Sequence, residues 1–193
     1  ALRTNALDLA GLRLANLHEL GKAAYLRIGD SVALKLLEEP HVYNITKDEL
    51  YEVNEDGFNF LKNCDGSRTL DQLAPDVEFL EYCVSENILE ARKNSGSRQL
   101  IFQKSPNPSL RYLEWLVTHR CNLKCSHCYL GEDRPEDFPR DLVIPLLNEL
   151  SLMQGLRVLV SGGEPTLYKH FQFLNEALGD FPLRFVLLSN GLA

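Results

Sequence analysis

The second half of the sequence alternates short apolar segments with segments of helical periodicity. Residues 110–118, 157–163 and 184–191 are rich in apolar, β-branched and aromatic side chains and predict strands. Between them, residues 141–155 and 170–180 carry apolar side chains at helical spacing. Strands of this type that alternate with helices indicate a parallel sheet covered on both faces. In such sheets and barrels the chemistry lies at the carboxyl ends of the strands, so functional residues are expected there.

Three cysteines follow the first of these strands. Cys121, Cys125 and Cys128 have the spacing C-x3-C-x2-C, and no fourth cysteine follows. Iron–sulfur cubanes are usually held by four thiolates, so three thiolates on one loop can hold three corners and leave the fourth iron open to another ligand. The alternative is a structural zinc bound by the three cysteines and His119, but structural zinc ligands usually come in separated pairs.

A second motif, SGGEP at residues 161–165, follows the second strand and should lie at the same edge of the sheet. Gly162 and Gly163 allow close approach of another group to the backbone. Glu164 supplies a carboxylate for a cationic group, and Pro165 stiffens the turn. Free backbone groups beside an acid suit a ligand that carries both an ammonium and a carboxylate. The alternative is that Glu164 serves only as a carboxylate at the start of a helix.

Together these motifs resemble the radical S-adenosylmethionine (SAM) superfamily. The resemblance implies that the three cysteines hold a [4Fe–4S] cluster, whose open iron chelates the methionyl amino and carboxylate groups of SAM. The cluster, reduced by an external low-potential electron donor, would cleave SAM to a 5′-deoxyadenosyl radical that abstracts hydrogen from the substrate. His127 takes the position that lies against the adenine in this family, and residues 189–191 resemble the end of its third strand. The implied cofactor-binding residues are His127, Tyr129, Gly162, Gly163, Glu164, Pro165, Ser189 and Asn190.

The same resemblance implies a fold, the partial (β/α)6 barrel. Residues 110–193 would form its first half, βαβαβ, truncated after the third strand. The other half normally supplies ribose and substrate contacts, and an open three-stranded edge with apolar faces would be prone to aggregate. We therefore expect the chain to be a fragment of a longer enzyme and to be nearly inactive by itself.

The first half of the sequence predicts a separate α+β unit, joined to the second half by a polar, turn-rich linker. The linker contains one short apolar stretch, LIFQ at residues 100–103, which predicts a strand. The expected divisions are an N-terminal helix or extension over residues 1–24, the α+β unit over 25–96, the linker over 97–109 and the sheet-forming part over 110–193.

Within the α+β unit the strands come first and three helices follow. Residues 32–46 predict an edge strand, or a strand broken at Pro40, because proline cannot donate to a sheet ladder. Residues 48–53 predict a second strand, and Asn54 is the expected cap of the first helix. The second helix is expected near residues 67–74. The third is expected over 76–92, with Val77, Leu80, Val84, Ile88 and Leu89 on its buried side.

Residues 49–74 and 79–90 resemble the peptide-recognition domain of ribosomal peptide maturases, typified by the pyrroloquinoline-quinone biosynthesis chaperone. The implied shape is winged-helix-like, so a DNA-binding winged helix is the alternative. The third helix carries more acidic than basic side chains and would repel phosphate. We expect a leader peptide to add as a strand along residues 48–53, and the acidic helix favours basic residues in that peptide. The expected peptide-binding residues are Glu49, Leu50, Tyr51, Glu52 and Val53.

Composition excludes several classes of partner. The net charge is −7, and neither half of the chain has a surplus of Lys and Arg, so we expect no nucleic-acid partner. The apolar runs are far shorter than the roughly 18 residues of a membrane span. Five cysteines, three of them clustered, suit a reducing compartment, so we expect a cytoplasmic protein. Cys64 and Cys83 are expected to be buried structural thiols.

These observations predict a radical SAM enzyme that modifies a ribosomally made precursor peptide. Two alternatives stay open: a radical SAM enzyme that matures a cofactor or another protein, and a peptide-binding module with a non-catalytic barrel fragment. The presence of both the cysteine triplet and GGEP favours an enzyme.

Overall fold

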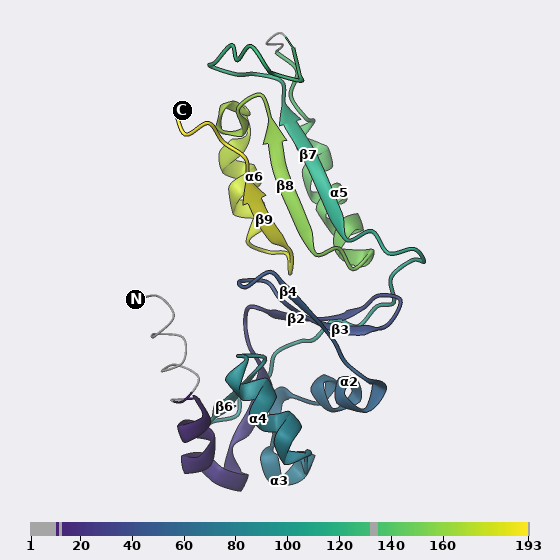
Figure 1. Ribbon diagram of the computed structural model, residues 1–193, viewed down its shortest axis with the longest axis vertical. Helices are drawn as coiled ribbons and strands as arrows, with labels where there is room; N and C mark the ends of the chain where they lie inside the picture. The colour runs from purple at the N-terminus through teal and green to yellow at the C-terminus, as the bar shows by residue number, and fades with distance from the viewer. Residues whose placement is uncertain (1–10, 12, 132–134, 193) are drawn as a thin grey trace. The chain divides into compact units, whose positions relative to one another are not determined.

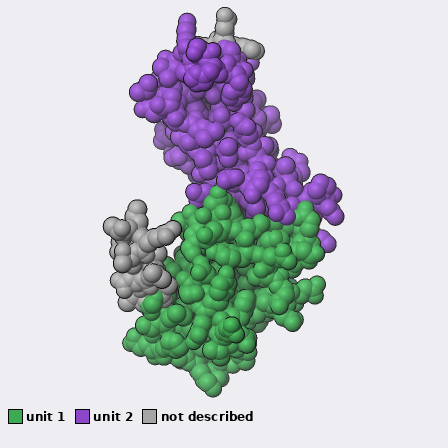
Figure 2. All heavy atoms as spheres, in the orientation of Figure 1, with its two compact units in different colours: residues 1–102 green, residues 103–193 purple. Residues whose placement is uncertain are grey.

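The computed structural model describes residues 11, 13–131 and 135–192. The chain divides into two compact units, residues 1–102 (unit 1) and 103–193 (unit 2), shown in Figure 2. Of the N-terminal helix or extension expected over residues 1–24, residues 1–10 and 12 lie outside the described part of the chain. Residues 13–20 are helical, and Leu17 is buried in the core of unit 1.

Unit 1 contains two antiparallel sheets of three strands each, with strand orders β5-β1-β6 and β2-β3-β4. Strands β2, β3 and β4 of the second sheet are labelled in Figure 1. The segment expected to be one strand broken at Pro40 is a hairpin of two strands, β2 and β3. Pro40 is the first residue of β3, a position that proline tolerates in a sheet. The strand bounds are Tyr25–Ile28 (β1), Val32–Leu36 (β2), Pro40–Asn44 (β3), Glu49–Glu52 (β4), Asp65–Thr69 (β5) and Leu89–Arg92 (β6).

The helices of unit 1 are α2 (Glu55–Lys62), α3 (Leu70–Leu73) and α4 (Val77–Ser85), preceded by a 3-10 turn, η1 (Gly21–Ala23). The cap expected at Asn54 is confirmed, because its side chain accepts a hydrogen bond of 2.8 Å from the backbone N–H of Gly57. No helix in the described part of the chain is long and apolar enough to cross a bilayer.

The helix expected over 76–92 is wrong in its second half. α4 ends at Ser85, Asn87 turns the chain with a φ of 61°, and β6 follows. Asparagine tolerates this left-handed conformation better than most residues. Val77, expected on the buried side, is 66% exposed. The short strand expected at 100–103 is also absent, since these described residues have no regular structure.

The core of unit 1 lies between the two sheets and the helices. Both thiols expected to be structural, Cys64 and Cys83, are buried within it, and burial raises the pKa of Cys83 to about 12 and that of Cys64 further. The buried members of this core are Leu17, Leu26, Ile28, Val32, Leu34, Val42, Phe58, Leu61, Cys64, Leu80, Cys83, Val84, Ile88 and Leu89.

Unit 2 is built on a parallel sheet of order β7-β8-β9, as the alternation of strands and helices predicted. The connections run through α5 and α6. The bounds are Tyr112–Thr118 (β7), Arg157–Gly162 (β8), Arg184–Leu187 (β9), Val143–Leu152 (α5) and Phe171–Leu178 (α6), with 3-10 turns at Arg140–Leu142 (η2) and Pro165–Leu167 (η3).

Both helices of unit 2 pack on the same face of the sheet (Figure 1). Trp115 and Val160 are register partners, and both are buried in the core that α5 and α6 complete. On the opposite face Glu114 is exposed and Leu159 only half-buried, so the described helices do not cover both faces as expected. The reason is topological: strands in sequential order joined by right-handed crossovers place every helix on one side.

Candidate functional site

The cysteine-bearing segment that follows β7 is closed at its base by backbone pairing. The N–H of His119 donates to the carbonyl of Glu136 (2.8 Å), and the N–H of Phe138 donates to that of Val117 (2.8 Å). The hydroxyl of Thr118 also donates to the Asp137 carboxylate (2.6 Å). The described residues 119–131 and 135 therefore lie between two anchored ends. We call this segment the cysteine loop.

The three thiols of this loop line one pocket of about 460 Å³. Cys121 is half-buried, Cys125 and Cys128 are exposed, and His119 and Gly163 complete part of the wall. All five cysteines of the chain lie among the described residues, and none forms a disulfide. Thiolates are the soft ligands that iron–sulfur clusters take, so the donor set fits a cluster.

A single metal ion would need its ligands gathered around one point. Among the described residues, no three His, Cys, Asp or Glu side chains are gathered in that way, and this includes the cysteines with His119. A cubane differs, because each thiolate binds a different iron and the donors are spread over its corners.

The two glycines of the SGGEP segment let its backbone pack against the cysteine loop. A Cβ on Gly162 would lie 2.2 Å from the carbonyl oxygen of Thr118, and one on Gly163 would lie 2.3 Å from that of Arg120. The N–H of Gly163 donates to Thr118 (2.9 Å), and that of Glu164 donates to Arg120 (2.7 Å). The close approach that the glycines were expected to allow is thus made, in this structure, by the cysteine loop itself.

Glu164 is fully buried, with 0% of its surface exposed. Its Oε1 accepts hydrogen bonds from the Thr166 N–H (3.1 Å), the Thr166 hydroxyl (2.6 Å) and the Ser189 hydroxyl (3.0 Å). Its Oε2 accepts one from the N–H of Asn190 (2.8 Å). Burial raises the pKa of Glu164, but the bonds from these three residues outweigh it and hold the pKa below its ordinary value.

The carboxylate of Glu164 therefore has two structural roles. It caps η3, as the helix-start alternative suggested, through its bonds to Thr166. It also joins the end of β8 to Ser189 and Asn190 after β9. The structure brings these three expected site residues together at one edge of the sheet.

A further residue at this edge was missed by sequence reasoning. This residue is Asn122, which follows Cys121 in the chain. Its Oδ1 accepts a hydrogen bond of 2.8 Å from the side-chain amide of Asn190. No local signal could have revealed Asn122, since its partner is 68 residues away in the chain.

Two expected cofactor-binding residues lie apart from the pocket. His127 and Tyr129 are exposed, Tyr129 by 73%, and neither lines the pocket of the cysteines. Pro165 is buried at the start of η3. The role expected for His127 and Tyr129 therefore stays a prediction.

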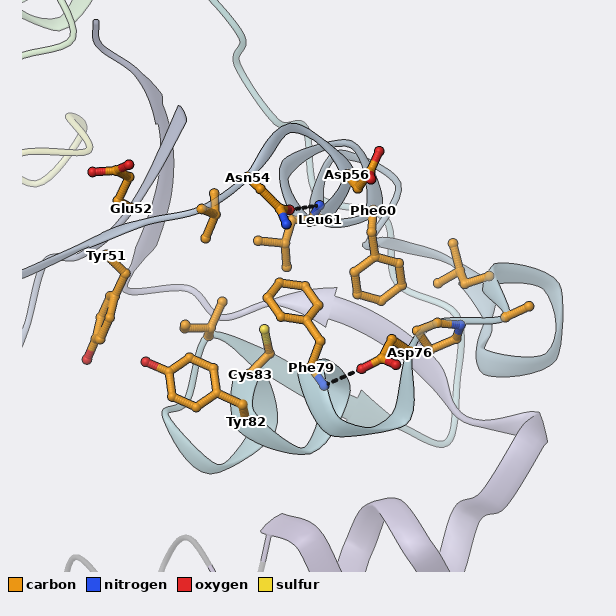
Figure 3. A pocket seen from close by; sticks show the side chains of 16 residues that line it. Tyr51, Glu52, Asn54, Asp56, Phe60, Leu61, Asp76, Phe79, Tyr82 and Cys83 are labelled. Atoms are coloured by element: carbon orange, nitrogen blue, oxygen red, sulfur yellow. Dashed lines mark hydrogen bonds between the residues drawn. The ribbon is translucent and has the colours of Figure 1, made fainter. Parts of the chain in front are cut away.

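Unit 1 contains a second hollow, a groove of about 770 Å³ between β4, α2 and the segment from α3 to α4 (Figure 3). Its lining is largely apolar and aromatic, and Phe60 and Phe79 meet edge to face with ring centroids 6.0 Å apart. Three of the five expected peptide-binding residues, Tyr51, Glu52 and Val53, line it; Glu49 and Leu50 do not. Within the described residues, β4 pairs with β3 alone and is an edge strand.

The charge around this groove is negative. Glu52, Asp56 and Asp76 are among its lining residues, which include no Lys, Arg or His. One of the glutamates expected to attract a peptide, Glu86, is partly neutralised. It accepts a hydrogen bond from the ammonium of Lys47 (2.7 Å), which lowers the pKa of Glu86. The carboxylates that line the groove are therefore the acidic groups nearest to a peptide bound there.

Known proteins similar to this chain include two curated relatives. Fe-coproporphyrin III synthase of Methanosarcina barkeri is 33% identical over 103 residues, which are 51% of this chain and 25% of that protein. The subtilosin biosynthesis protein AlbA of Bacillus subtilis is 29% identical over 110 residues, 48% of this chain and 24% of that protein. The chain thus spans about a quarter of the length of these relatives.

The fold is also similar to a solved structure, that of SuiB from Streptococcus suis bound to the precursor peptide SuiA. The TM-score is 0.58 at 19% identity, over 87% of this chain and 43% of that one, and this similarity concerns the fold alone. The model of the radical SAM superfamily matches residues 115–193, which hold the cysteine loop, the SGGEP segment and the end of β9. Proteins of that superfamily typically bind a [4Fe–4S] cluster and SAM. This match covers fewer than half of the residues of the chain, and over it the chain is similar to the radical SAM superfamily.

Proposed function

We propose that this chain is part of an enzyme that binds a [4Fe–4S] cluster and SAM and modifies a ribosomally made precursor peptide. The observation that carries the first half of this proposal is the junction of the three strand ends in unit 2. Backbone bonds join the SGGEP segment to the cysteine loop, and Glu164 joins both to Ser189 and Asn190. The three strands then correspond to the first half of a six-unit barrel.

In this proposal Cys121, Cys125 and Cys128 hold the cluster, which with SAM supplies the radical chemistry when bound. Glu164 receives the methionyl ammonium. A carboxylate oxygen has two lone pairs, and Oε2 accepts one bond, from Asn190, against three on Oε1. An external low-potential electron donor and a reducing, cytoplasmic setting belong to the same proposal.

The test of the cluster is anaerobic reconstitution of the protein with iron and sulfide. We expect about four irons per chain and a brown protein, and Cys→Ala substitution at 121, 125 or 128 should abolish both. Cys64→Ala is the matched control, because this thiol is buried in unit 1 and should leave the iron content unchanged. A colourless protein that retains one zinc per chain would show that the site is a zinc site instead.

We infer that unit 1 is a winged-helix-like peptide-recognition domain that binds the leader of the precursor along β4. An edge strand offers unpaired backbone donors and acceptors to an extended peptide, and neighbouring pockets select its side chains. The groove beside β4 provides such pockets, with aromatic walls from Tyr51, Phe60 and Phe79. The precursor peptide bound to SuiB and the bacteriocin named for AlbA support this substrate class.

The groove also indicates the chemistry of the peptide. Its carboxylates, at Glu52, Asp56 and Asp76, favour apolar anchors flanked by Lys or Arg, with affinity that falls as salt rises. Glu52→Lys should therefore weaken binding of a basic, apolar leader several-fold in a titration followed by fluorescence anisotropy. Glu78→Lys is the matched control, since it makes the same charge change at an exposed site of α4 outside the groove lining.

Equal effects of the two substitutions would remove the groove from the proposal. Binding of duplex DNA at physiological salt, without response to any precursor peptide, would instead favour a winged-helix regulator. The similarity to Fe-coproporphyrin III synthase favours the second candidate function, maturation of a cofactor. In that case the cluster test would succeed while every leader peptide failed to bind.

A further inference from the structure

Asn122 links the cysteine loop to the end of the third strand. Its Oδ1 accepts a hydrogen bond of 2.8 Å from Nδ2 of Asn190, and its Nδ2 donates to the carbonyl of Leu192 (3.3 Å). Oδ1 of Asn190 in turn accepts from the N–H of Leu192 (2.9 Å). Both amide side chains therefore use a donor and an acceptor in the same small set of bonds. We call this set the asparagine link.

The asparagine link closes a ring of contacts among the three strand ends. The cysteine loop is joined to the SGGEP segment by the bond from the Glu164 N–H to the Arg120 carbonyl (2.7 Å). The carboxylate of Glu164 is joined to the backbone N–H of Asn190 (2.8 Å). Asn190 returns to the cysteine loop at Asn122. A displacement of any one segment must therefore be shared with the other two, or a bond must break.

The ring meets the cysteine loop directly at the first cysteine. Asn122 lies between Cys121 and Leu123 in the chain. The backbone N–H of Leu123 donates a hydrogen bond to the sulfur of Cys121, with a donor–acceptor distance of 3.4 Å. Cys121 is half-buried, whereas Cys125 and Cys128 are exposed. Of the three thiols, Cys121 is thus the one whose position depends most on the asparagine link.

We propose that Asn122 is a positioning residue that holds Cys121 in place through Asn190 and, beyond it, the Glu164 carboxylate. This proposal deepens the function proposed above, because it makes the geometry of one cluster ligand depend on the carboxylate assigned to SAM. The dependence runs through this chain's own bonds, so it is present before any cofactor binds. It can therefore be measured on the metal-free protein.

The experiment compares alkylation rates of the three thiols in metal-free protein at one fixed pH, with an iodoacetamide probe read out by peptide mass spectrometry. Asn122→Ala should raise the rate at Cys121 several-fold relative to Cys125 and Cys128, which serve as references within the same molecule. Asn190→Ala should have the same effect. The double variant should add little, because each substitution alone already breaks the bond between Asn122 and Asn190.

Two further variants distinguish positioning from general loosening. Asn122→Asp retains the acceptor for Asn190 and should raise the Cys121 rate less than Asn122→Ala. Asn175→Ala, which shortens an exposed asparagine of α6, should leave all three rates unchanged. Glu164→Gln places an amide where a carboxylate oxygen now accepts from Asn190, so it should also raise the Cys121 rate.

Three outcomes would overturn the proposal: equal acceleration at all three cysteines, additive effects of Asn122→Ala and Asn190→Ala, or no change at Cys121. If Asn122→Ala destabilises unit 2, hydrogen exchange of residues 188–192 in the Asn122→Asp variant provides the same comparison. Slower exchange there than in Asn190→Ala supports the link, and equal exchange contradicts it. None of these readouts uses the cluster or SAM, so a failed reconstitution leaves their result intact.

Discussion

Gly163→Ala tests whether the SGGEP segment packs against the cysteine loop as closely as the structure shows. A Cβ at this position would lie 2.3 Å from the carbonyl oxygen of Arg120, 2.7 Å from its carbonyl carbon and 2.8 Å from the carbonyl oxygen of His119. All three are backbone atoms, so no side chain can rotate to make room. Ordinary contact begins at 3.4 Å, and the two segments must therefore separate by about 1 Å.

The free-energy cost follows from the bonds that this separation stretches. The N–H groups of Gly163 and Glu164 donate to Thr118 and Arg120 over 2.9 and 2.7 Å. Each such bond contributes about 0.5–1.5 kcal/mol, and overpacking adds about 1–3 kcal/mol. Gly→Ala also restricts the unfolded chain, and this offsets about 0.4–1 kcal/mol of the loss. We therefore expect the unfolding free energy of unit 2 to fall by roughly 1–5 kcal/mol.

The assay is urea unfolding followed by tryptophan emission. Trp115 is the only tryptophan, is 4% exposed in the core of unit 2 and packs edge to face on Phe138, so its emission reports this unit alone. Gly179→Ala is the matched control, because its Cβ would meet nothing closer than 3.6 Å. If Gly163→Ala and Gly179→Ala unfold within about 0.5 kcal/mol of each other, the close packing of the two segments is refuted.

Two further predictions concern single hydrogen-bonded side chains. Asn54→Ala should lower the stability of unit 1 by about 0.5–2 kcal/mol, since it removes the cap of α2. The measurement is thermal unfolding followed by circular dichroism. Asn59→Ala, at an exposed position of the same helix, should not lower the stability, and equal losses in the two variants would contradict the capping role. Because the pKa of Glu164 is lowered in the folded protein, its contribution to stability is complete above the unfolded value near 4.5 and is lost as the pH falls through the folded value. The urea concentration at the midpoint of unfolding, followed by Trp115 emission, should therefore fall as the pH is lowered. It should fall less steeply with pH in Glu164→Gln, and an equal dependence on pH in both proteins would contradict this assignment.

The sequence predicted well those elements whose hydrophobic periodicity fits only a helix or only a strand. The apolar strands and the helices of unit 2 alternate clearly, and each appears in the structure, although β9 ends at Leu187 rather than at residue 191. β6 was missed because the spacing of Val84 and Ile88 also fits a helix, and the turn at Asn87 is set by local conformation rather than by periodicity. β5 was missed because Asp65–Thr69 is polar, and only its pairing with β1 makes it a strand.

The candidate site was predictable to the level of segments but not of contacts. Parallel strands end at one edge, so the cysteine loop, the SGGEP segment and the end of β9 were expected to meet. Which atoms meet depends on register. A register shift between Leu116 and Thr118 places Thr118 opposite Gly162, and no sequence pattern marks that shift. In unit 1 a peptide-binding edge was expected at residues 48–53, but the acidic lining of the groove beside it includes Asp56 and Asp76, which come from two other segments of the chain.

The contacts of Glu164 determine how its substitution has to be interpreted. Removal of a partner for a buried ammonium costs roughly 2–5 kcal/mol of binding free energy, so Glu164→Ala should weaken SAM binding. The same substitution also removes four hydrogen bonds that join β8 to Thr166, Ser189 and Asn190. A weakened affinity would therefore follow from lost charge, from lost geometry or from both. Asn122→Ala separates them, because it retains the Glu164 carboxylate and its four bonds while it breaks the asparagine link. If Asn122→Ala leaves SAM affinity near that of the parent while Glu164→Ala abolishes it, the charge of Glu164 binds the ligand. If both weaken SAM binding equally, the carboxylate acts through the position of the cysteine loop.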